Sequence, residues 1–282
     1  SDGFDLKLII TVDCGITSVE EAEHIQALGI DIIITDHHEC KEVLPKAWSV
    51  LNPHKPGCPY PFKDLAGAGV ALKLVHALGI KTGNNDAYRA YLDLAALATV
   101  ADVVPLLGEN RIIVKNGLKA IENTKNIGLG ALLRFSGFYG RNLTATNIAF
   151  GIAPRINAAG RMGGALRGIR LLTEKNLAVC EALARELDIE NRTRQELEDR
   201  IVEEAMEQAK ELAYTYRHKV LVVSGSGWHQ GIIGIVASKL LQSYNRPCIV
   251  ISVEDGTGKG SGRSLECFNI FRALDYCSGV LT

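Results

Sequence analysis

An aspartate and two histidines follow directly on an apolar segment near the start of the chain. Residues 31–35 are rich in isoleucine, which is typical of a buried strand, and Asp36, His37 and His38 come next. Open α/β sheets keep their active sites at the carboxyl ends of strands, and carboxylates and imidazoles are metal ligands. A single histidine there is more often a solvated loop residue, with the aspartate capping a turn. Two adjacent histidines after an aspartate favour metal or phosphate chemistry.

A second acid, Asp13, follows the preceding predicted strand. Residues 6–12 read as a buried parallel strand, and Ser18 with Glu21 predicts a capping box for a helix up to residue 28. In a right-handed strand–helix–strand unit both strand ends lie at one edge of the sheet, so Asp13 can meet His37. The simpler alternative is that Asp13 only caps the following turn.

A third acid, Asp102, ends a predicted helix at residues 86–101 that is almost continuously apolar, and valines flank it. A carboxylate in such surroundings is costly to ionise without a partner. It must therefore bind a cation or accept several hydrogen bonds, and we favour the cation.

The remaining pattern of strands and helices predicts an α/β protein with two domains. Residues 1–173 form the expected larger domain around a parallel sheet, and residues 219–282 form a smaller α/β domain that looks incomplete. Between them, residues 174–218 read as a long charged helix that connects the two.

Three glycine-rich segments could bind phosphate. Residues 151–164 carry Arg155, Asn157 and Arg161 among small residues, which permit close approach of a ligand, and arginine offers forked donors to phosphate oxygens. Residues 225–231 and 256–264 each follow a predicted strand. The alternative for all three segments is a solvated loop.

Composition describes an ordinary globular protein. The chain has 282 residues and a formal net charge of -1, so no global basic field indicates a nucleic-acid partner. Seven cysteines without a C-x-x-C pair argue against a disulfide framework and a structural zinc site. No leader and no membrane span is evident, and we expect a cytoplasmic protein.

Six motifs occur in order along the chain, at residues 12–15, 36–38 (Asp-His-His), 98–106, 154–161, 228–238 and 261–264. In order and spacing they resemble the RecJ family of single-strand-specific 5′–3′ DNA exonucleases in the DHH phosphoesterase superfamily. The resemblance covers essentially the whole chain. It implies a DHH domain, a connecting helix and a DHHA1 domain, with metal ions and DNA in the cleft between the two domains.

The resemblance also implies roles for individual residues. Asp13, His37 and Asp102 are expected to bind Mn²⁺ or Mg²⁺, with Asp13 bridging two ions, and the mixed aspartate and histidine set fits Mn²⁺ better. Asp36 would orient a histidine, and His38 would face the scissile phosphate. The implied contacts to the substrate are Arg155, Asn157, Arg161, Trp228, His229, Ser261 and Arg263.

The implied activity is metal-dependent hydrolysis of single-stranded DNA in repair and recombination, with single-strand-binding protein and a helicase as partners and no membrane. Two motifs of the family would lie before Ser1 and beyond Thr282. We therefore expect an internal fragment that keeps at most one complete metal site and little nuclease activity. Robust Mn²⁺-dependent degradation of single strands by this chain would contradict that expectation.

Two other functions remain open. One is an oligoribonuclease or cyclic-dinucleotide phosphodiesterase of the same superfamily, which would use the same metal core. The other is a non-catalytic replication scaffold that keeps the fold. The long charged helix and Trp228-His229 favour the exonuclease over the first, and the intact acidic and histidine set speaks against the second.

Overall fold

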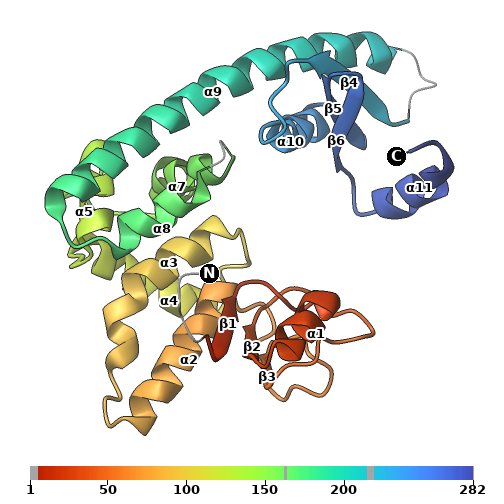
Figure 1. The fold of residues 1–282 in the computed structure, drawn as a ribbon. Coiled ribbons are helices and arrows are strands. Elements are labelled where there is room, and N and C mark those ends of the chain that lie inside the picture. Colours follow the sequence, from red (N-terminus) through yellow and green to blue (C-terminus); the bar gives the residue numbers. More distant parts are fainter. Residues whose placement is uncertain (1–5, 162–163, 215–218, 282) are drawn as a thin grey trace. The chain divides into compact units, whose positions relative to one another are not determined.

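The computed structural model describes residues 6–161, 164–214 and 219–281 (Figure 1). The chain divides into two compact units, which we call unit 1 (Ser1–Pro154 with Leu171–Ala184) and unit 2 (Arg155–Arg170 with Arg185–Thr282). Each unit contains a three-stranded sheet, which confirms the predicted α/β fold with a second, smaller α/β part. The predicted domain boundaries at residues 173 and 218 remain a proposal.

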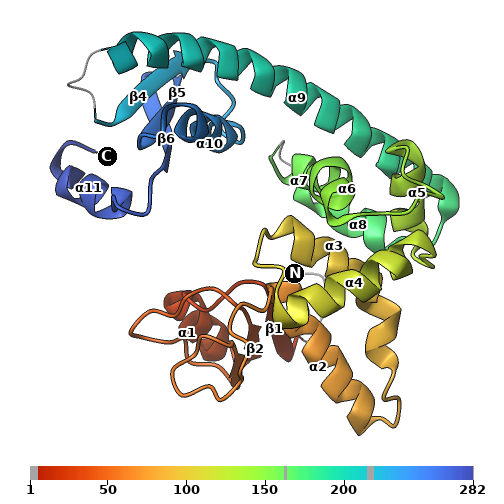
Figure 2. The ribbon, with the colours of Figure 1, turned by 180° about the vertical axis from the view of Figure 1, so that it is seen from behind.

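The sheet of unit 1 is parallel, in the order β1 (Leu8–Val12), β2 (Asp31–Thr35) and β3 (Ser49–Leu51). In both views it lies between α1 (Val19–Ala27) and α2 (Gly67–Lys81) (Figures 1 and 2). The sheet pairs the last residue of β1 with the last residue of β2. The segments that follow the two strands therefore begin at the same edge, as the sequence predicts.

Two details of the first strand and helix differ from expectation. Leu8, Ile10 and Val12 are between 43% and 52% exposed, so β1 presents one apolar face to solvent in the described structure and is not a buried strand. The capping box is also wrong, because the side chain of Ser18 accepts no hydrogen bond at the start of α1. Burial of this sheet is concentrated on β2, where Ile32 and Ile34 pack in a cluster with α1.

The other regular elements described in unit 1 are helical. A 3₁₀ turn (Ala87–Tyr91) precedes α3, so the expectation of one buried helix from residue 86 is wrong for its first turns, where Tyr91 is half exposed. The unit contains α3 (Leu92–Ala101), α4 (Gly108–Glu122), α5 (Ile127–Phe135), α6 (Ala145–Asn147) and a π-helical turn (Ile148–Ile152). Helix α3 packs chiefly against α4. This pairing fixes the segment between them, which includes Asp102.

Unit 2 has a mixed sheet of β4 (Leu221–Ser226), β5 (Cys248–Glu254) and β6 (Thr257–Arg263), with β4 and β5 parallel and β6 antiparallel to β5. Its helical elements are α7 (Ala153–Arg161), α8 (Ala165–Thr173), α9 (Leu177–Tyr214), α10 (Ile233–Tyr244) and α11 (Ile270–Tyr276), and the boundary between the units cuts α7, α8 and α9. Apolar residues of α9, α10, β4 and β5 form its core. Residues 215–218, the end of the predicted long helix, lie outside the described residues.

Two of the predicted glycine-rich loops are regular structure. Residues 257–263 form β6, because glycine at alternate positions still completes the ladder with β5. Residues 153–161 are helical, and residues 162 and 163 of the same segment lie outside the described part of the chain. All seven cysteines are free. No helix among the described residues is long and apolar enough to cross a membrane.

A charged network in unit 1 gives a prediction for the pH dependence of stability. Glu109 of α4 accepts a hydrogen bond from Tyr60 and pairs with Lys73 of α2. Burial alone would raise the pKa of Glu109, but Lys73 and Tyr60 together lower it below its ordinary value of 4.5. Burial alone would lower the pKa of Lys73, yet Glu109 holds it above its ordinary value of 10.5.

We expect this network to stabilise the protein most between about pH 4.5 and pH 10.5. A lowered carboxyl pKa contributes stability that is lost as the pH falls below 4.5, and a raised lysine pKa contributes stability that is lost as the pH rises above 10.5. In Glu109→Gln, the melting temperature should therefore fall less steeply than in the wild type, both below pH 4.5 and above pH 10.5. Glu23→Gln, which breaks an exposed pair with Lys46, serves as the control and should leave the profile unchanged. Identical profiles for Glu109→Gln and the wild type would contradict the prediction.

Candidate metal centre

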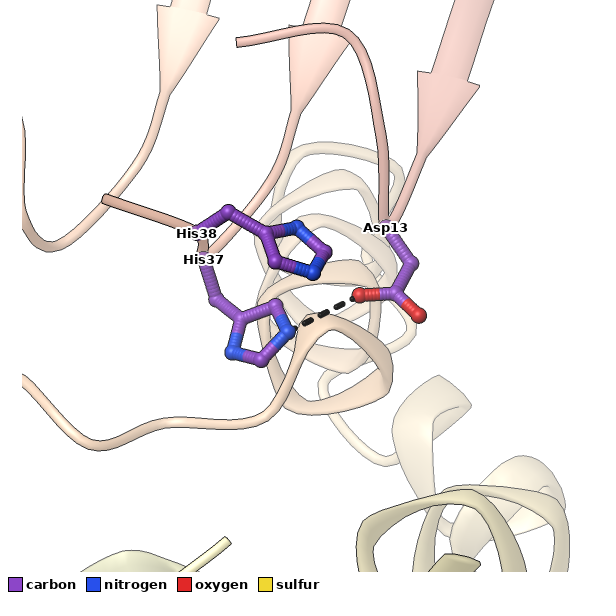
Figure 3. A group of neighbouring side chains, drawn as sticks. All are labelled: Asp13, His37 and His38. Atoms are coloured by element: carbon purple, nitrogen blue, oxygen red, sulfur yellow. Dashed lines mark ion pairs between the residues drawn. The ribbon is translucent and has the colours of Figure 1, made fainter. Parts of the chain in front are cut away.

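Three side chains from separate segments of unit 1 meet at one point. The Nε2 atom of His37 lies 3.1 Å from Oδ1 of Asp13 and 3.3 Å from Oδ2 of Asp102. Asp13 follows β1, His37 follows β2 and Asp102 caps the end of α3. Figure 3 shows the side chains of Asp13 and His37 directed toward each other, with His38 beside them. The convergence of these residues is thus a feature of the structure, whereas their role as ligands stays a prediction.

The Nε2 atom of His37 has no hydrogen-bond partner, although it is buried. A buried polar atom without a partner is costly, and here it faces two carboxylate oxygens. Burial raises the pKa of Asp13 against the opposing effect of His37, and Asp102 raises it further. One ligand atom each from Asp13, His37 and His38 also lies within 4.8 Å of the others. A nitrogen atom and carboxylate oxygens that converge in this way fit a divalent cation.

Asp36 is 1% exposed and organises the segment that carries both histidines. Its Oδ1 atom accepts hydrogen bonds from the backbone of His37 at 2.8 Å and from Nδ1 of His38 at 2.7 Å, and its Oδ2 accepts one from the backbone of Ile16 at 2.9 Å. Burial alone would raise the pKa of Asp36, but these bonds outweigh it and lower the pKa. Asp36 therefore stays ionised, and it fixes the ring of His38.

The hydrogen bond to Asp36 also acts on His38. This hydrogen bond raises the pKa of His38. Burial lowers the pKa of His38, but its effect is smaller. The side chain of His38 is 59% exposed, so its other ring nitrogen can reach a ligand. This geometry suits a protonated imidazole that donates to an anionic oxygen.

Left-handed backbone turns place both acids. Asp13 itself has φ 61°, which aspartate adopts more readily than most residues. Val103, directly after Asp102, has φ 60°, and this conformation is unfavourable for a β-branched residue by roughly 1–3 kcal/mol. Each turn ends a strand or helix and directs a carboxylate toward His37.

The start of α2 lies against Asp13. A Cβ atom at Gly67 would overlap the Asp13 carboxylate, so only glycine permits this approach. Helix N-termini carry a partial positive charge, which favours a nearby carboxylate. Gly67 thus belongs to the site although it offers no ligand.

Two buried asparagines that sequence reasoning missed hold the segments of the site. Asn52, 4% exposed, donates to the carbonyl oxygen of His38 at 2.9 Å. Asn110, fully buried in α4, donates to the carbonyl oxygens of Asp64 at 2.6 Å and Pro105 at 3.0 Å. An asparagine in a loop or helix gives no distinct signal in a single sequence, because partners such as the carbonyl oxygen of Asp64 lie far along the chain.

The predicted substrate contacts fall in unit 2. The side chain of Arg155 is 16% exposed, and its Nε pairs with Asp188 at 2.7 Å. Asn157 and Arg161 are exposed on the same helix, and Arg161 donates to the carbonyl oxygen of Gly231 at 3.0 Å. Arg161 therefore bridges α7 and the turn before α10.

Trp228 does not fit the direct DNA contact that the resemblance implies. Its ring is 3% exposed and packs on Gly225, and its Nε1 donates to Glu204 at 2.6 Å. The physical reason is that a large apolar ring in this turn completes the core of unit 2. The neighbouring His229 is partly exposed, and its Nδ1 accepts a hydrogen bond from the backbone of Gly231.

The last two predicted contacts lie at the end of β6. Arg263 is exposed and donates to the carbonyl oxygen of Gly262 at 2.8 Å, and its guanidinium lies 3.4 Å from the hydroxyl of Ser261. A Cβ at Gly234, in the first turn of α10, would lie near both side chains. The two residues thus face the start of α10.

Comparison with family models finds two matches. The "DHH family, N-terminal domain" model matches residues 4–99, and the "DHHA1 domain" model matches residues 217–280. The matched segments contain Asp13 and His37 in the first case and His229, Ser261 and Arg263 in the second. Asp102 lies just outside the first.

Curated relatives match nearly the whole chain. The single-stranded-DNA-specific exonuclease RecJ of Bacillus subtilis is 42% identical over 98% of this chain, and that of Escherichia coli is 39% identical over 95%. The chain spans 34% and 49% of the length of these two relatives.

Solved structures agree with the sequence comparisons. RecJ from Thermus thermophilus in complex with Mn²⁺ matches with a TM-score of 0.83 and 36% identity, covering 97% of this chain and 40% of that one. An exonuclease RecJ bound to manganese matches with the same TM-score and 38% identity, covering 95% of this chain and 66% of that one.

Proposed function

We propose that this chain, which combines a DHH domain with a DHHA1 domain and is homologous to RecJ over almost its whole length, is the catalytic part of a single-stranded-DNA-specific exonuclease. The reaction is hydrolysis of phosphodiester bonds in the 5′–3′ direction with Mn²⁺ or Mg²⁺. The observation that carries the proposal is the buried Nε2 atom of His37, which makes no hydrogen bond and lies between the carboxylates of Asp13 and Asp102.

Asp13, His37 and Asp102 would hold the divalent ion. When bound, such an ion activates water and neutralises charge on the phosphate. The two carboxylates supply the negative charge that retains it, and the imidazole nitrogen favours Mn²⁺ over an ion that prefers only oxygen donors. Relatives with Mn²⁺ in their structures support this assignment.

His38 serves the substrate. Its ring is fixed through Nδ1 by Asp36, and its exposed edge lies beside the carboxylate of Asp13. A protonated His38 would donate to a phosphate oxygen and stabilise the charge that develops there. Asp36 would not bind the ion, because its carboxylate oxygens already accept hydrogen bonds from backbone N–H groups of Ile16, His37 and His38.

Unit 2 supplies contacts to the DNA strand. Asn157, Arg161, His229 and Arg263 keep accessible polar groups, and guanidinium groups suit phosphate oxygens. Trp228 supports the turn that carries His229 and does not itself touch the strand. Since the net charge of the chain is -1, affinity must come from such local groups, and it should fall steeply with salt.

The cellular setting belongs to the same proposal. The chain would act in the cytoplasm in DNA repair and recombination, with single-strand-binding protein and a helicase as partners. Its relatives are named as exonucleases specific for single-stranded DNA, which supports the substrate class.

The test compares substrates in a protein extended to the length of its relatives. With Mn²⁺, we expect release of nucleotides from the 5′ end of a 5′-phosphorylated single strand, little action on a duplex, and no preference for dinucleotides. Preferred hydrolysis of dinucleotides would indicate the oligoribonuclease instead. Absence of both Mn²⁺ binding and hydrolysis would indicate a scaffold and contradict the proposal.

A further inference from the structure

Val103 stands at the end of α3 in a position that glycine normally occupies. Asp102 is the C-cap of the helix, and the next residue adopts the left-handed conformation with φ 60°. Helices often end this way, and glycine is the usual residue because it has no Cβ. Three other helices of unit 1 follow the rule, with Gly29 after α1, Gly83 after α2 and Gly137 after α5, all at φ between 74° and 80°.

The described residues leave the side chain of Val103 largely exposed to solvent. It is 87% exposed, the highest value among the exposed large apolar residues that the structure describes in unit 1. A buried isopropyl group could offset the strained backbone by packing, but this one is largely exposed among the described residues. Neither helix termination nor core packing therefore accounts for a valine here.

The position of Val103 links it to the candidate metal centre. It directly follows Asp102, whose carboxylate lies 3.3 Å from Nε2 of His37. Consecutive Cα atoms are about 3.8 Å apart, so the backbone of Val103 lies next to a residue of that centre. A phosphate that met an ion there would bring its own sugar, which is bonded to it, next to Val103.

We propose that Val103 is a substrate-contacting residue, whose isopropyl group packs against the deoxyribose of the nucleotide at the reacting phosphate. This inference rests on the proposed function and deepens it, because it names the part of the substrate that the rim of the site touches. Val103 combines a strained backbone with an exposed apolar side chain, next to a residue of the site. A contact that forms only when the substrate is present explains both features.

Three variants test the assignment. Val103→Gly removes the side chain and suits the backbone, while Val103→Thr keeps the β-branch and the strain but replaces a methyl group by a hydroxyl. Val43→Gly removes another exposed valine, 63% exposed in a loop of unit 1, and is the matched control. Each is compared with the wild type for Mn²⁺ affinity, melting temperature and affinity for a 5′-phosphorylated phosphorothioate oligo(dT), which resists hydrolysis.

We expect Val103→Gly to weaken oligo(dT) binding about fivefold and Val103→Thr about twofold, with Mn²⁺ affinity unchanged. The melting temperature of Val103→Gly should equal or exceed that of the wild type, because the strain is relieved, whereas Val43→Gly should leave DNA binding intact. Unchanged DNA affinity in Val103→Gly would overturn the assignment. A parallel loss of Mn²⁺ affinity would also overturn it, because Val103 would then act only through the orientation of the Asp102 carboxylate.

A 5′-terminal abasic deoxynucleotide separates a sugar contact from a base contact. The loss in Val103→Gly should persist with this oligonucleotide, since the sugar is still present. If the loss disappears, the contact is to the base and the proposal is wrong. Failure of the proposed function is distinguishable, because the wild type would then bind no single-stranded DNA in any of these measurements.

Discussion

Asp13→Asn is expected to lower the affinity for Mn²⁺ by at least about 100-fold, equivalent to about 2.7 kcal/mol. The substitution keeps the shape of the side chain but removes one of the two charges that face His37. In the wild type, Mn²⁺ at about 100 times its dissociation constant should stabilise the folded state by about 2.7 kcal/mol. The variant should lose this stabilisation, and isothermal titration with melting curves measures both effects.

The same variant should behave in the opposite way without metal. Burial and the neighbouring Asp102 raise the pKa of Asp13, so its charge is unfavourable in the metal-free protein. In chelator, Asp13→Asn should therefore melt at or above the temperature of the wild type. Asp86→Asn, which removes an exposed acid paired with Arg89, is the control and should keep the full response to Mn²⁺. A variant that melts lower in chelator and still responds to Mn²⁺ would show that Asp13 is structural.

Gly67→Ala should weaken Mn²⁺ binding about tenfold although it adds a single methyl group. In a helix, alanine is ordinarily more favourable than glycine by up to about 1 kcal/mol. Here the new Cβ would overlap the carboxylate of Asp13, which must turn away from His37. Titration with Mn²⁺ and a melting curve in chelator should show a site that is weaker in a protein that remains folded.

The control for this substitution is another helical glycine of the same unit. A Cβ at Gly130 in α5 would meet nothing closer than 3.9 Å. Gly130→Ala should therefore stabilise the protein slightly and leave Mn²⁺ affinity unchanged. Equal Mn²⁺ affinities for Gly67→Ala and the wild type would mean that the position of Asp13 does not depend on α2.

The sequence predicts the structure correctly where a pattern is local or where few chain connections are allowed. The apolar β2 segment and the handedness of the strand–helix–strand unit place Asp13 and His37 at one edge of the sheet, and the structure has them there. Asp102 joins them because α3 packs on α4. The cost of a carboxylate beside apolar residues predicted only a cation or hydrogen bonds for Asp102, and the resemblance to the RecJ family grouped it with the other two. The α/β fold and the relation to RecJ are confirmed, whereas the residue roles remain predictions.

The misses have physical causes of two kinds. The exposure of β1 and the burial of Trp228 depend on what packs nearby, and a single sequence does not encode that explicitly. The side-chain amides of Asn52 and Asn110 donate to backbone oxygens 14 and 46 residues away along the chain. The left-handed conformation of Val103 runs against the preference of its residue type, so no propensity could predict it.

The most direct test of the central claim is the anomalous scattering of Mn²⁺ in crystals of this protein. We expect an anomalous peak bounded by the carboxylates of Asp13 and Asp102 and by Nε2 of His37, and no such peak in crystals of Asp13→Asn. A Mn²⁺ peak at another place in unit 1, with no peak beside these three side chains, would contradict the proposed metal centre.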